Sequence, residues 1–81
     1  MTLEELQAEL WTILAAEEQS PPDWATVEER CFRTVGRLAT EPEPNYPHDV
    51  VYHYLDDPDV RQKSDRYGDQ QRQRLRQWLE G

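Results

Sequence analysis

Apolar residues recur every three or four positions at the start of the chain. They are Leu3, Leu6, Leu10, Ile13 and Leu14. This spacing places them on one face of an α-helix. Thr2 and Glu5 have the spacing of a capping box at its start, and the ring of Pro21 disfavours helical geometry at Ser20. The pattern therefore predicts a helix over residues 3–18.

A second helical pattern follows over residues 23–39, where Asp23 or Ser20 can cap the helix. Its main apolar stripe consists of Trp24, Val27, Cys31, Val35 and Leu38. A second, smaller line contains Ala25, Phe32, Gly36 and Ala39. The small residues in that line would let another backbone approach closely; the alternative is that Gly36 only weakens an exposed face by about 1 kcal/mol relative to Ala.

Residues 40–47 contain three prolines in the sequence TEPEPNYP and are predicted to form an extended linker. The next segment, residues 50–55, is rich in residues that favour strands. A lone strand would need an edge from another chain, which implies a dimeric β-ribbon. Pro47 and Asp49 instead suit the first turn of a helix, so a helix over residues 47–55 is favoured.

The last helical pattern covers residues 58–80. Asp57 is suited to cap it and Pro58 to occupy its first position. At Gly68 the helix can end in a left-handed cap, with Asp69 restarting it, or run on with a weak point. Leu75, Trp78 and Leu79 form its final apolar patch. The chain is therefore predicted to be all-α: a small bundle of three main helices plus a short connecting helix, in a single helical domain over residues 1–81.

Charge is distributed unevenly along these 81 residues, whose net charge is −8. Most acids precede residue 61, whereas residues 61–81 hold more bases than acids. Direct nucleic-acid binding is disfavoured, because phosphates repel a protein that is acidic overall. The basic C-terminal segment is expected to neutralise acidic helices, either within the chain or between subunits.

Candidate chemistry is sparse. On a helix, Asp49, His53 and Asp57 would line one face, which makes them weak candidates for metal ligands. Cys31 lies in the middle of an apolar stripe and is expected to be a core residue. The sequence has no serine elbow, glycine-rich phosphate loop or zinc-peptidase histidine pair. It therefore predicts neither an enzyme nor a cofactor.

The remaining features favour a small acidic, non-enzymatic protein-binding or regulatory module that acts through a helical apolar-aromatic surface. Its partner is another protein or a second copy of the chain. The candidate contacts are Trp78 and Leu79, with Leu75 beside them, and Trp11 at the edge of the first stripe. The alternative, which is favoured for Leu75, Trp78 and Leu79, is that they complete the core. With one cysteine, no leader and no apolar run of membrane-spanning length, a cytoplasmic protein with no membrane partner is expected.

Two other functions remain open. One is an acidic mimic of nucleic acid that blocks a nucleic-acid-binding protein. Its charges would come from residues Glu4, Glu5, Glu9, Glu17, Glu18, Asp23, Glu28 and Glu29. The more distant alternative is a metal-dependent enzyme that uses Asp49, His53 and Asp57.

Overall fold

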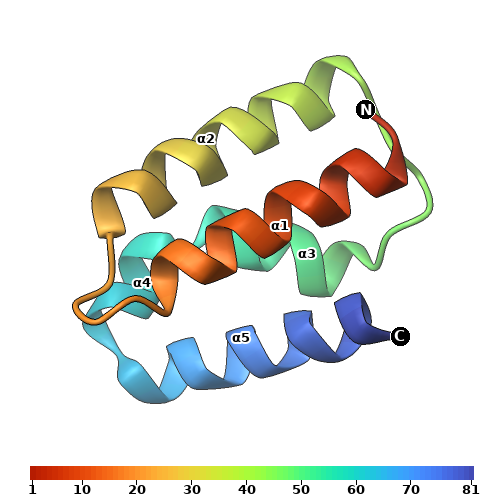
Figure 1. Ribbon diagram of the computed structural model, residues 1–81. Helices are drawn as coiled ribbons and strands as arrows, with labels where there is room; N and C mark the ends of the chain where they lie inside the picture. Colours follow the sequence, from red (N-terminus) through yellow and green to blue (C-terminus); the bar gives the residue numbers. More distant parts are fainter.

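The computed structural model describes all of residues 1–81 and contains five α-helices and no strand. The helices are α1 (Leu3–Glu17), α2 (Trp24–Thr40), α3 (His48–Asp56), α4 (Pro58–Lys63) and α5 (Asp65–Glu80). The three long helices α1, α2 and α5 lie in front of the short α3 and α4 in the view of Figure 1. The predicted all-α class is confirmed, with two short helices in place of one.

The starts of the helices follow from local capping. Thr2 and Glu5 form the expected capping box, because each side chain accepts a hydrogen bond from the other residue's backbone N–H. Asp23 accepts from the backbone N–H of Thr26 and caps α2. Asp57 occupies the N-cap position of α4, but its side chain forms no capping hydrogen bond and accepts from the Tyr67 hydroxyl instead; Pro58 is at the start of that helix.

Residues 50–55 lie inside α3, so the alternative of an intermolecular strand is wrong. The backbone N–H groups of Val50 and Val51 both donate to the carbonyl of Pro47, at the start of the helix. Pro47 is the N-cap residue, where a missing N–H costs nothing. Propensity for strands is overridden here because Val51, Tyr54 and Leu55 share the buried face of a helix.

The possible break at Gly68 is not observed, and the helix instead breaks four residues earlier, at Ser64. Ser64 has an extended backbone, and its hydroxyl accepts a hydrogen bond from the N–H of Tyr67 to cap α5. Gly68 lies inside α5 and is buried. A Cβ atom at this position would lie 2.8 Å from the guanidinium nitrogens of Arg72. The glycine therefore makes room for that side chain within a continuous helix.

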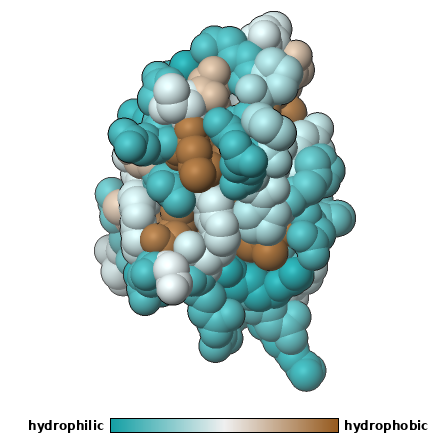
Figure 2. Space-filling model, turned by 90° about the vertical axis from the view of Figure 1, so that its right-hand side faces the viewer, coloured by the Kyte–Doolittle hydropathy of each residue, from teal (hydrophilic) through white to brown (hydrophobic).

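The core is mostly apolar, although Glu17, Thr34, Arg61 and Gln71 are also buried. Its buried apolar residues are Leu6, Leu10, Ile13, Leu14, Ala16, Val27, Cys31, Leu38, Val51, Tyr54, Leu55 and Leu75. They come from α1, α2, α3 and α5, whereas the buried residue of α4 is the charged Arg61. On the side of the molecule where both termini lie, apolar groups are exposed as separate small patches among polar ones (Figure 2). None of the helices combines the length and the apolar character needed to span a bilayer.

The second line predicted on α2 faces outward. Ala25, Phe32, Gly36 and Ala39 are all exposed. A Cβ atom built on Gly36 meets no other atom within 4 Å, so no neighbouring backbone approaches it. Gly36 is therefore an exposed glycine that only weakens the helix, which was the alternative interpretation. Phe32, on the same outward face, is exposed to solvent.

Candidate functional site

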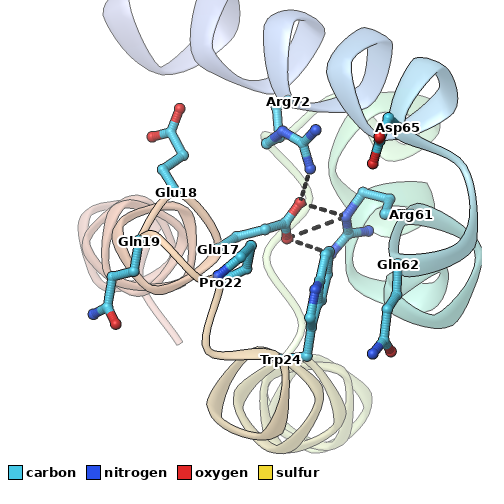
Figure 3. A pocket seen from close by; sticks show the side chains of 9 residues that line it. All are labelled: Glu17, Glu18, Gln19, Pro22, Trp24, Arg61, Gln62, Asp65 and Arg72. Atoms are coloured by element: carbon cyan, nitrogen blue, oxygen red, sulfur yellow. Dashed lines mark hydrogen bonds and ion pairs between the residues drawn. The ribbon is translucent and has the colours of Figure 1, made fainter.

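The polar end of the core is centred on the carboxylate of Glu17, whose side chain is completely buried. Arg61 donates to it from Nε at 3.0 Å and from Nη2 at 3.0 Å. Arg72 adds a hydrogen bond at 2.6 Å and the hydroxyl of Tyr54 another at 2.9 Å. In Figure 3, Arg72 reaches the Glu17 carboxylate from above and Arg61 reaches it from the right. A buried carboxylate is tolerated here because its charge is paired and its oxygens are hydrogen-bonded.

Arg61 connects this carboxylate to two further helices. Its guanidinium lies 3.8 Å above the centroid of the Tyr54 ring and donates to the Tyr54 backbone carbonyl. Nη2 is also 4.0 Å from the sulfur of Cys31. Arg61 thus joins α4 to α1, α2 and α3. Arg61 is the buried residue of α4, which supplies no buried apolar side chain.

Cys31 is fully buried beside the cluster, as expected for a core residue. Burial raises the pKa of its thiol to about 11. Burial, reinforced by the neighbouring Glu17, likewise raises the pKa of the Tyr54 hydroxyl. Both groups therefore stay protonated at neutral pH. The thiolate needed for nucleophilic attack is absent under these conditions.

A cleft of about 490 Å³ opens above the cluster. Its lining is almost entirely polar: Glu17, Glu18, Gln19, Pro22, Trp24, Arg61, Gln62, Asp65 and Arg72 (Figure 3). The two arginines are turned toward Glu17, and Arg72 also pairs with Asp69 at 2.8 Å. Their cationic groups are thus already neutralised within the chain. The cluster is best understood as the polar support of the fold.

The basic C-terminal segment closes onto the first helix, as one of the sequence-based alternatives predicted. Arg72 pairs with Glu17, and Arg76 pairs with Glu18. Arg76 also lies over the ring of Trp11, 5.8 Å from its centroid. Neutralisation between α5 and α1 is therefore intramolecular.

A second hollow, the Phe32 groove, has the opposite character. It has a volume of about 460 Å³ and is lined by Glu28, Phe32, Val35, Leu55, Asp56, Pro58 and Asp59. Phe32 and Val35 come from α2, Leu55 from the end of α3 and Pro58 from the start of α4. Phe32 is 84% exposed, far more than any other large apolar residue. A solvent-exposed aromatic ring beside an apolar hollow is a candidate contact with another molecule.

The rim of the Phe32 groove is acidic. Glu28, Asp56 and Asp59 are exposed at its edge, and none of them forms an ion pair or a side-chain hydrogen bond within the chain. The arginines that form ion pairs all turn to other carboxylates: Arg30, Arg33, Arg37, Arg61, Arg72, Arg74 and Arg76. The rim therefore keeps its negative charge, whereas much of the remaining acidic surface is neutralised.

The predicted partner contacts are placed differently from one another. Leu75 is fully buried and is a core residue, so it is not available to a partner. Trp78 and Leu79 are partly buried and pack against the core from α5. Trp11 is 39% exposed, but Arg76 covers one side of it. The structure thus leaves Trp11 as the most exposed of the four, and Phe32 is more exposed still.

The weak metal candidates do not form a site. Asp49 lies 3.6 Å from Arg74, and Asp57 accepts a hydrogen bond of 2.6 Å from the Tyr67 hydroxyl. His53 is exposed. No group of three or more His, Cys, Asp or Glu side chains is arranged to hold a metal ion. Spacing along α3 was a poor guide because Asp57 lies beyond the helix end, with a non-helical backbone.

No protein-family model, curated protein or solved structure matches this chain. Its surface is therefore interpreted from its own chemistry. Sequence reasoning placed Phe32 on a minor apolar line and missed the groove, although one aromatic residue off the main stripe was a signal for it. It also counted Glu17 among the acids of a charged surface, whereas this residue is buried.

Proposed function

We propose that this protein is a non-enzymatic binding module that holds a segment of another protein in the Phe32 groove. The observation that carries the proposal is the 84% exposure of Phe32 beside an apolar floor. Covering an aromatic side chain removes about 150–250 Å² from water and contributes up to about 4–6 kcal/mol. That contribution is not used within the chain, so it is available to a partner.

The same proposal assigns no reaction to the chain. Cys31 is buried, with a thiol pKa of about 11. The internal carboxylate, Glu17, already accepts from Arg61, Arg72 and Tyr54. Neither group is free to act as a nucleophile or a base at neutral pH.

Of the two surfaces that carry an exposed aromatic, the Phe32 groove is the better contact. Trp11 is less exposed than Phe32 and is partly covered by Arg76. Trp78 and Leu79 are partly buried against the core, so their removal affects the fold as well as any contact. We assign Trp11 a secondary role at most.

The nucleic-acid mimic is less well supported. Such a mimic needs a row of free negative charges, but arginines of α2, α4 and α5 neutralise many of those on and just after α1. Glu5 pairs with Arg37, Glu9 with Arg30, Glu17 with Arg61 and Arg72, and Glu18 with Arg76. The unpaired acids that remain include Glu28, on the rim of the Phe32 groove, where an apolar floor favours a protein partner.

The test is affinity capture with a tagged chain from an extract of the cells that produce it. The wild-type chain is expected to retain a partner that Phe32→Ala loses. The matched control is Trp11→Ala, which removes the other exposed aromatic and should retain the same partner. Retention by Phe32→Ala together with loss by Trp11→Ala would move the contact to α1 and α5 and overturn the proposal.

A further inference from the structure

We infer that the occupant of the Phe32 groove is an amphipathic helix with an apolar face flanked by lysine or arginine. This inference rests on the proposed function, because it specifies the partner of the same groove. Its first support is charge. Glu28, Asp56 and Asp59 border the apolar floor without intramolecular partners, so a basic segment would complement all three at once.

The direction of the groove is the second support. Glu28, Phe32 and Val35 are at positions i, i+4 and i+7 of α2, so they follow one face of that helix over about 10 Å. A helix laid along this line needs at least two turns to meet all three. Its apolar residues would contact Phe32 and Val35, and its basic residues would reach the acids on either side.

An extended peptide fits less well. Strand addition takes its affinity from the backbone groups of an exposed sheet edge. This chain has no strand and therefore no sheet edge, and the Phe32 groove is lined by side chains of three helices. Affinity at this site has to come from side chains, which an amphipathic helix presents on one face.

A second copy of the chain is also a poor occupant. In a two-fold dimer built through this groove, Glu28, Asp56 and Asp59 would face the same residues of the other copy. Each copy also carries a net charge of −8. All of its arginines except Arg66 form ion pairs within their own chain, so only Lys63 and Arg66 are unpaired basic side chains. Anionic membranes and nucleic acids are repelled for the same reason.

The test uses three synthetic peptides that are blocked at both ends. The first has leucine on one helical face and lysine at its borders. The second has the same composition in an order that forms no single apolar face, and the third carries glutamate in place of lysine. Binding is measured by fluorescence anisotropy, and the site is located from amide chemical shifts. The first peptide is expected to bind and to shift residues of the Phe32 groove, and the other two should bind at least about tenfold more weakly.

Matched charge variants separate a specific groove from general attraction. The variant Glu28→Gln/Asp56→Asn/Asp59→Asn removes the rim charges, and the control Glu4→Gln/Asp65→Asn/Glu80→Gln removes three exposed, unpaired acids elsewhere. Both have the same net charge. The rim variant should weaken binding of the first peptide by about tenfold or more, whereas the control changes it by less than about twofold. Equal losses from both variants would overturn the inference.

Two further outcomes distinguish this inference from the proposed function. If the partner captured through Phe32 is retained equally by the rim variant, the groove binds protein but the basic occupant is wrong. If sedimentation shows that the wild-type chain self-associates and that Phe32→Ala does not, the occupant is a second copy. Both results would leave the groove as a binding site. The Phe32 groove would be ruled out as the binding site by a partner or peptide that binds Phe32→Ala as tightly as wild type.

Discussion

The guanidinium of Arg61 forms three hydrogen bonds of 3.0–3.2 Å with the carboxylate of Glu17, and both side chains are completely buried. This pair joins the last residue of α1 to α4, which contributes no apolar residue to the core. A buried ion pair of this kind contributes little net stability when it is intact. Removal of one partner is costly, because the other charge is left buried and unpaired.

We therefore expect Glu17→Gln to lower the free energy of unfolding by about 3–5 kcal/mol. The matched control is Glu18→Gln at the next position, where the ion pair with Arg76 is on the surface. That substitution should cost less than about 1 kcal/mol. Urea unfolding followed by circular dichroism measures both values. Similar costs for the two variants would show that the Glu17 cluster is not the support described above.

Two glycines inside helices offer a second paired test. Gly36→Ala should raise the free energy of unfolding by about 1 kcal/mol, because the site is exposed and a Cβ meets nothing there. Gly68→Ala brings the same gain in helix propensity, but its Cβ would displace the guanidinium of Arg72 from its place near Glu17. We expect a smaller gain at residue 68, or a loss.

A double-mutant cycle isolates the cause of that difference. In an Arg72→Ala background the obstruction is gone, so Gly68→Ala should recover the full gain of about 1 kcal/mol. Chemical unfolding of the four variants measures the coupling free energy. If Gly68→Ala stabilises wild type and the Arg72→Ala background equally, the Arg72 side chain does not oppose a Cβ atom at residue 68.

The elements of the fold were largely predictable, because their signals are local. Apolar spacing along α1 and the caps at Thr2 and Asp23 depend on residues close in sequence. The possible break at Gly68 is not observed, since this glycine lies inside α5 with the guanidinium of Arg72 over it. A glycine that weakens a helix and one that admits a neighbouring side chain look the same in sequence.

The candidate site was much less predictable, because it depends on contacts between distant residues. Arg61 is 44 residues from Glu17 in sequence, and nothing in either local pattern links them. Exposure of Phe32 likewise follows from how α3 and α4 pack beside α2, leaving the hollow that Leu55 and Pro58 line. The net charge indicated an acidic surface, but only the ion-pair arrangement shows which acids remain free.

Substitution of the large aromatics should affect stability in the order of their burial. We expect Trp78→Ala to cost about 2 kcal/mol or more, because Trp78 packs against the core. Trp11→Ala should cost less, and Phe32→Ala should change stability by no more than about 0.5 kcal/mol, given its 84% exposure. Thermal and urea unfolding measure this order. A large loss at Phe32 would mean that its exposure is not that of the folded protein in solution.

Alkaline pH should destabilise the protein through Cys31 and Tyr54. In the folded state the Cys31 pKa is raised from 9.0 to about 11, so the folded chain keeps a proton that the unfolded chain releases. The contribution of the Cys31 thiol to the free energy of unfolding is therefore fully present below pH 9. It falls as the pH rises toward 11, by up to about 3 kcal/mol. Burial and Glu17 raise the Tyr54 pKa and act in the same direction.

Urea unfolding at pH 8, 9 and 10 should show the decline in the free energy of unfolding, and Cys31→Val should make that decline shallower. The Cys31 Cβ chemical shift reports the thiol directly, and a midpoint near pH 9 in the folded protein would contradict this account.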